Sequence, residues 1–189
     1  MEILTGIFTA FGLSASAGLN AYIPLLVVAL LARFTNLMKL TPPWDTLASP
    51  WIIGLLILLC AVEFFADKIP AVNHLNDAIQ TIIRPAAGAI AFAASAQVVT
   101  DIHPALSLAA GLLVAGTVHT VKSAAVRPAV TATTAGAGNV PVSMAEDALA
   151  TILSILSVVI PLILAVIVIL VTSWLVLRIW QRANRARPA

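Results

Sequence analysis

The chain consists of long apolar stretches separated by short polar segments, and this pattern predicts its elements. Two runs, 3–32 and 148–177, contain no Asp, Glu, Lys or Arg, and shorter uncharged runs cover 46–62, 85–100 and 102–121. A helix that crosses the hydrocarbon core of a bilayer needs about 20 apolar residues, with a lower limit of about 17. We therefore predict an all-α integral membrane protein with about five transmembrane helices, at 3–33, 50–66, 84–100, 104–121 and 148–177.

The composition supports the prediction of a membrane protein. Charged residues make up 10% of the 189 positions and hydrophobic residues 61%, and the mean hydropathy is +1.06. A soluble domain carries about 25% charged residues, so lipid must be the main solvent. No positive charge precedes the first apolar run, and we expect it to be retained as a helix rather than cleaved as a signal peptide.

Two segments of similar sequence predict an internal repeat. GLLILLCAVEFFADKIPAV at 54–72 resembles GLLVAGTVHTVKSAAVRPAV at 111–130, and the acidic segments NDAIQTII at 76–83 and EDALATIL at 146–153 follow them. Each unit holds two spans, so both copies would enter the membrane in the same direction. We expect one transmembrane domain over 1–189, made of a first helix and loop (1–49) and two parallel hairpins (50–103 and 104–189).

The repeat makes particular positions equivalent. Pro70 should correspond to Pro128 after rotation about the membrane normal. Asp77 and Asp147 should begin two equivalent helices, where the helix dipole favours a carboxylate.

Lysine and arginine predict the orientation. The basic tail RIWQRANRARPA directly follows the last apolar run, and cytoplasmic segments next to a span carry an excess of Lys and Arg. We expect the C-terminus in the cytoplasm and, with five spans, the N-terminus outside. Contact with anionic lipid headgroups explains the basic tail, and we expect no nucleic acid partner.

Several charged side chains fall inside or at the edge of the predicted spans. Glu63 and Asp67 are four residues apart and His119 and Lys122 are three apart, so each pair shares a helical face. Such groups are costly at membrane depth and usually face a bundle interior or a watery cavity, although Lys and Arg can also reach the headgroups. We expect Asp67 to have a basic partner, Lys122 or Arg127, because a lone carboxylate there is costly.

The first apolar run has small and polar residues in its middle, GLSASAGLNAYIP. Ser14 and Gly18 form a small-xxx-small pair that permits close helix packing, and Asn20 needs a partner. A broken or re-entrant helix that lines a cavity is the alternative. On the packing hypothesis, the segment 12–20 lies against the inward faces of the hairpins.

The stretches SAGLNAYIPLL, ADKIPAVNHLNDAIQT, RPAAG, HTVKSAAVRP and AEDALA lie along the chain between residues 16 and 150, and the resemblance that they carry runs over nearly the whole chain. Together they resemble a family of bacterial integral membrane proteins known as domain of unknown function 4126 (DUF4126). The resemblance implies a multi-pass protein of the bacterial inner membrane and carries over no activity. It also marks several residues as family-type positions: Asp67, Lys68, Pro70, Asp77, His119, Lys122 and Glu146.

A small transporter or channel is the function that these features favour. Its mixed-charge site would lie between the hairpins on the outer side and would suit an anionic or zwitterionic small molecule or a lipid headgroup. His119 could couple the movement to protons, and we expect a homo-oligomer or a membrane-complex partner because five short helices enclose little space. The expected site residues are Glu63, Asp67, Lys68, Asp77, His119, Lys122, Arg127 and Glu146.

Two other function classes stay open. In a non-catalytic accessory or assembly subunit, the same charges would form internal salt bridges that fix helix register. A lipid-modifying enzyme is the third hypothesis, but the chain has no His-Glu-x-x-His or Gly-x-Ser-x-Gly motif. His74, His103 and His119 are too scattered to predict a metal site, and we expect no cofactor.

Overall fold

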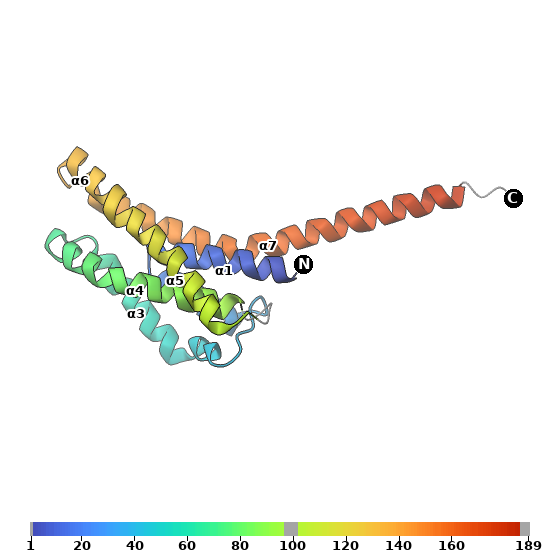
Figure 1. Ribbon diagram of the computed structural model, residues 1–189, viewed down its shortest axis with the longest axis horizontal. Coiled ribbons are helices and arrows are strands. Elements are labelled where there is room, and N and C mark those ends of the chain that lie inside the picture. The colour runs from blue at the N-terminus through green and yellow to red at the C-terminus, as the bar shows by residue number, and fades with distance from the viewer. Residues whose placement is uncertain (1, 97–101, 186–189) are drawn as a thin grey trace.

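A computed structural model describes residues 2–96 and 102–185, and within these ranges the chain is helical and contains no strand. Figure 1 shows α1, α3 and α5 running toward the end of the bundle where α6 lies, and α4 and α7 running back from it. The elements are α1 (Glu2–Leu19), α2 (Tyr22–Phe34), the 3₁₀ turn η1 (Trp44–Ala48), α3 (Pro50–Ala66), α4 (Pro70–Ala96), α5 (Pro104–Val121), the π turn η2 (Lys122–Val126), α6 (Arg127–Thr134) and α7 (Asn139–Arg185).

Three of these segments are long and apolar enough to cross a membrane: Asn76–Ala96, Pro104–Thr134 and Asn139–Ile160. Gly6–Leu19, Tyr22–Phe34 and Pro50–Ala66 are shorter apolar helices. Large apolar side chains also cover the outside of the bundle, as at Trp51, Ile82 and Leu113. The protein therefore spans a membrane, and lipid covers these side chains.

The first apolar run is two helices, so it is broken, as the alternative to one packed helix predicted. The helix ends at Leu19, and Asn20 Oδ1 accepts hydrogen bonds from the N–H groups of Tyr22 and Ile23 (both 3.1 Å), which begin α2. The Asn20 side chain thus satisfies N–H groups that a helix start leaves without intrahelical partners. Because the expected placement of the termini on opposite sides assumed one span here, this break removes its basis.

The bounds of α3 and α5 match the predicted spans, whereas α4 and α7 begin earlier than predicted. Pro70 opens α4, but Pro128 lies in the first turn of α6, which continues α5 through η2. Their equivalence under the repeat stays a prediction. Asp77 and Asp147 lie about two turns inside their helices rather than at the N-termini. The last apolar run forms one continuous helix, α7.

α1 is the central helix, and α4, α5 and α7 pack around it. Ser16 Oγ donates to the Ala150 carbonyl (2.7 Å) and Thr9 Oγ1 donates to the Ser157 carbonyl (2.8 Å), both on α7. Ser14 Oγ donates to the Gly111 carbonyl on α5 (2.8 Å). Lipid gives helices no hydrophobic reason to associate, so small residues and hydrogen bonds of this kind hold such bundles together.

Glycines bring α4 and α5 into backbone contact. A Cβ on Gly111 would lie 2.7 Å from Ala89 Cα, so even one added methyl group would force the two helices apart. At Gly54 on α3, a Cβ would meet nothing within 4 Å.

α7 has 47 residues and is therefore about 70 Å long, roughly twice the thickness of the hydrocarbon core. Its C-terminal part extends beyond the other helices (Figure 1, orange to red).

We predict that Gly111→Ala lowers the free energy of unfolding by about 1–3 kcal/mol, because overpacking at a backbone contact strains the structure. Gly54→Ala is the matched control and should leave stability unchanged. Thermal unfolding of both purified variants in the same detergent measures the difference. Equal melting temperatures would show that α4 and α5 do not pack at this distance.

Candidate functional site

Six buried charged side chains form one continuous network at the end of the bundle where α1 stops. Each is at most 6% exposed, and they come from α3, α4, η2, α6 and α7 and from the residue after α3. The ion pairs are Glu63–Arg84 (2.8 Å), Asp67–Arg84 (3.9 Å), Asp67–Arg127 (3.1 Å), Glu146–Arg127 (2.8 Å) and Glu146–Lys122 (2.9 Å).

The π turn η2 explains how two cations reach one carboxylate. Its backbone bond runs from the Arg127 N–H to the Lys122 carbonyl, five residues back. This wider turn brings residue 127 back over residue 122, so both side chains reach Glu146 on α7. π turns inside α-helices are rare and occur frequently at functional sites.

Polar side chains complete the contacts of Asp67. Asn76 Nδ2 donates to Asp67 Oδ1 (2.7 Å), and Ser143 Oγ donates to Oδ2 (3.3 Å). With Arg127 on the same carboxylate, the sequence-based expectation of a basic partner for Asp67 is met.

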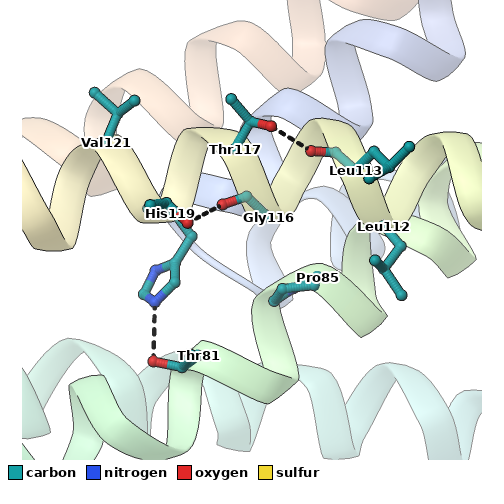
Figure 2. A pocket seen from close by; sticks show the side chains of 9 residues that line it. Thr81, Pro85, Leu112, Leu113, Gly116, Thr117, His119 and Val121 are labelled. Atoms are coloured by element: carbon teal, nitrogen blue, oxygen red, sulfur yellow. Dashed lines mark hydrogen bonds between the residues drawn. The ribbon is translucent and has the colours of Figure 1, made fainter.

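His119 joins the network through Arg84. Its Nδ1 lies 3.2 Å from Arg84 Nη1, and its Nε2 lies 3.3 Å from Thr81 Oγ1, across the gap between α5 and α4 (Figure 2). Arg has only donors, so Nδ1 must accept and the ring proton must sit on Nε2. The Thr81 hydroxyl itself donates to the Asp77 carbonyl, which leaves its oxygen to accept from His119.

The break between α1 and α2 contacts the same network. Lys122 Nζ donates to the Leu19 carbonyl (2.9 Å) at the C-terminus of α1, where the helix dipole favours a cation. Asn20 Nδ2 donates to Asp147 Oδ1 (3.0 Å), and Asp147 Oδ2 lies 3.9 Å from Lys68 Nζ. The interrupted backbone is therefore satisfied by charged and polar side chains.

With a neutral His119, the six charges of the network sum to zero: three carboxylates face two guanidinium groups and one ammonium group. The carboxylates also keep spare capacity. Glu63 Oε2 and Glu146 Oε1 are buried and accept no hydrogen bond from the part of the chain that is described. A proton or a donor group of a ligand could bind at either oxygen.

The structure brings together six of the eight residues expected at the site. Glu63, Asp67, His119, Lys122, Arg127 and Glu146 come together, whereas Lys68 lies at the margin beside Asp147. Asp77 does not join the network. Of the residues expected to pack or line a cavity, Ser14 and Asn20 are buried and bonded, and Gly18 lies against Ala115 and Val118 of α5.

Sequence reasoning missed Arg84, which is fully buried. The predicted span 84–100 places Arg84 at its boundary, because the polar residues before it favour a turn. Charge balance was the available signal, since Glu63 and Asp67 outnumber the basic residues nearby. Among the described side chains, no group of three His, Cys, Asp or Glu residues could hold a metal ion.

Two clefts lie beside the network, on the seam between α4 and α5–α6. The first has a volume of roughly 370 Å³ and is lined by Thr81, Pro85, Leu112, Leu113, Gly116, Thr117, His119, Thr120 and Val121 (Figure 2). The second has a volume of roughly 430 Å³ and is lined by Asp77, Ser123, Arg127, Pro128, Thr131, Ala132 and Asn139.

Comparison with known families identifies the family of the chain. Residues 7–182 match the family model described as domain of unknown function (DUF4126), and the chain belongs to this family, as its sequence motifs indicated. No curated protein and no solved structure matches it.

We predict that Arg84→Met destabilises the protein by about 3–5 kcal/mol, because it leaves the Glu63 carboxylate buried without its cation. Adding Glu63→Gln should restore part of this loss. Lys68→Met, which removes a longer and more exposed pair, should cost less than about 1 kcal/mol. Chemical unfolding in detergent measures all three. A double variant no more stable than Arg84→Met alone would contradict the pairing.

Proposed function

We propose that this DUF4126 protein is a small membrane transporter or channel for an anionic or zwitterionic solute, and that the buried charge network is its binding site. The observation that carries the proposal is the position of the network at a helix break. Secondary transporters bind charged substrates where membrane helices are interrupted, because helix ends and unpaired backbone groups supply partial charges there. Lys122 and Asn20 occupy this position between α1 and α2.

The charge balance of the network constrains what it can carry. A net charge added to a buried site is costly. A zwitterion adds none, so it can enter alone. A monovalent anion that takes the place of Glu146 at Lys122 and Arg127 leaves that carboxylate uncompensated, and one proton on the carboxylate restores neutrality. Anion movement is therefore coupled to one proton. Glu146 is the group that holds this proton, because its Oε1 accepts no hydrogen bond in the described ranges, whereas both ring nitrogens of His119 already have partners.

A change in the conformation of the π turn would rearrange the charges of the site. Lys122 and Arg127 face the same carboxylate only while the i→i+5 bond of η2 holds them on one side. Conversion of this turn to regular α-helix would rotate one cation away from Glu146 and open the network toward the neighbouring cleft.

The proposal includes the topology of the protein and the membrane that contains it. α3–α4 and α5–α7 are a duplicated pair of parallel hairpins in the bacterial inner membrane, with the basic C-terminal tail on the cytoplasmic side. The protein works as a homo-oligomer or within a membrane complex, and the tail contacts anionic lipid headgroups.

An accessory or assembly subunit is the second candidate. The observation in its favour is that all six charges of the network already have partners within the chain. In that case the network only fixes helix register, and no solute moves.

Proteoliposomes containing the pH dye pyranine distinguish the two candidates. External acetate, glutamate or inorganic phosphate is added, and internal pH and solid-supported membrane currents are recorded. Glycine is added in isotope-labelled form and its uptake is counted, because a zwitterion that enters alone changes neither internal pH nor current. A transporter gives solute-dependent signals in the wild type, whereas an accessory subunit gives none with any of the four probes.

We predict that Glu146→Gln uncouples anion entry from proton movement. The substitution gives the network one net positive charge, so an anion can bind without a proton. An anion current should appear, because the wild-type movement of one anion with one proton carries no net charge, and the internal pH change should disappear. Asp45→Asn, at an exposed carboxylate in η1, is the control and should behave as wild type. Retention of the wild-type pH change by Glu146→Gln would rule out Glu146 as the proton site.

A further inference from the structure

The two clefts beside the network lie end to end along one seam. On α4, Asp77 lines the second cleft and Thr81 and Pro85 line the first, and these residues are four apart. Such spacing places them on one helical face. On the facing wall, Gly116 and Thr120 line the first cleft and Ser123 and Arg127 the second, again at spacings of three or four. From Asp77 to Pro85 the seam is about 12 Å long.

The second cleft differs from the first because two charged residues, Asp77 and Arg127, lie in its wall. Asp77 Oδ1 is buried and has no hydrogen-bond partner in the described ranges, and no described Lys or Arg forms a salt bridge with Asp77. Arg127, Ser123 and Thr131 line the same cleft. This cleft can therefore receive an ammonium group and an anionic group side by side.

The first cleft is mainly apolar and opens toward lipid. Its walls include Leu112, Leu113, Pro85 and Val121, and Leu112, Leu113 and Val121 are each about half exposed or more. Both walls belong to segments that are long and apolar enough to cross the membrane. Exposure on such a segment means contact with acyl chains.

The order of the two clefts matches the order of a phospholipid. The second cleft, with Asp77 and Arg127 in its wall, lies beside α6 and the start of α7, at the end of the spanning segments. The first cleft lies deeper along α5. A lipid has its headgroup at the membrane boundary and its acyl chain in the core.

We propose that the seam between α4 and α5–α6 is a binding site for a phospholipid with a primary-amine headgroup. The ammonium group binds Asp77, the phosphate lies beside Arg127 and the two hydroxyl groups, and one acyl chain follows Pro85 and Gly116. This site borders the buried network and shares Arg127 with it, and a lipid ligand goes beyond the proposed transport. An acidic headgroup without an amine would leave the Asp77 carboxylate buried and unpaired, which is costly.

Native mass spectrometry of the full chain in detergent tests the proposal with three dioleoyl lipids: phosphatidylethanolamine, phosphatidylcholine and phosphatidylglycerol. The wild type should bind the ethanolamine lipid about tenfold more tightly than the glycerol lipid. Asp77→Asn should bind the two equally, and Asp45→Asn should keep the preference. Equal binding of all three lipids by the wild type, or a preference that survives Asp77→Asn, overturns the proposal.

The acyl-chain contact is tested at Gly116, where an added Cβ would approach Pro85 no closer than 3.7 Å. Gly116→Leu fills the apolar cleft and should weaken binding of every lipid, whereas Gly54→Leu adds the same bulk on α3 and should not. If Gly116→Leu fails to fold, Gly116→Val replaces it.

Soluble phosphoethanolamine separates a lipid from a free solute that carries the same headgroup. At equal concentration it should not displace the lipid. Displacement by the soluble compound, with no effect of bulk at Gly116, would make this a site for a free solute and overturn the lipid proposal. The solute-dependent change of internal pH in proteoliposomes is recorded for the same variants, so failure of the lipid site and failure of transport are read separately.

Discussion

A charge buried in a membrane bundle needs an opposite charge beside it, and in this protein that need fixes the relative positions of five elements. Desolvation costs several kcal/mol per ion, so each of these groups remains inside only while its partner is in place. Glu63 ties α3 to α4 through Arg84, and Glu146 ties α7 to η2 and α6. Because each ion touches the next, none of these helices can shift alone without leaving a charge unmatched.

Small residues and hydroxyl groups hold the remainder of the bundle, away from the charges. Gly111 allows α5 to reach the backbone of α4, and the serines of α1 bond to carbonyl groups of α5 and α7. These contacts are weak individually and depend on close approach. The charged end therefore sets which elements meet, and the small-residue contacts set how closely they pack. Both clefts lie between the two regions, where side chains are neither fully paired nor fully packed.

The uncharged runs were sufficient to predict α3 and α5, because a proline begins each helix and a charged residue follows it. The first turns of α4 were not predictable in this way. Their polar residues suggest a turn in a chain that is otherwise apolar, and they are helical because Asn76 and Arg84 face the network. The break at Asn20 could not be decided either, since the same small and polar residues suit a packed helix and an interrupted one. The family resemblance identified the family correctly, but it implied no activity and no role for any residue.

The central position of α1 has a consequence for biosynthesis. α1 leaves the ribosome before the helices that it packs against, but Thr9 and Ser16 find their partners on α7, at Ser157 and Ala150. At about 5–20 residues per second, translation must continue for roughly ten seconds or more before those partners exist. Until then α1 presents hydroxyl groups and Asn20 to the bilayer or to the insertion machinery. α1 thus reaches its final surroundings only after α7 has been made, and a chain that stops before α7 would leave α1 partly uncovered.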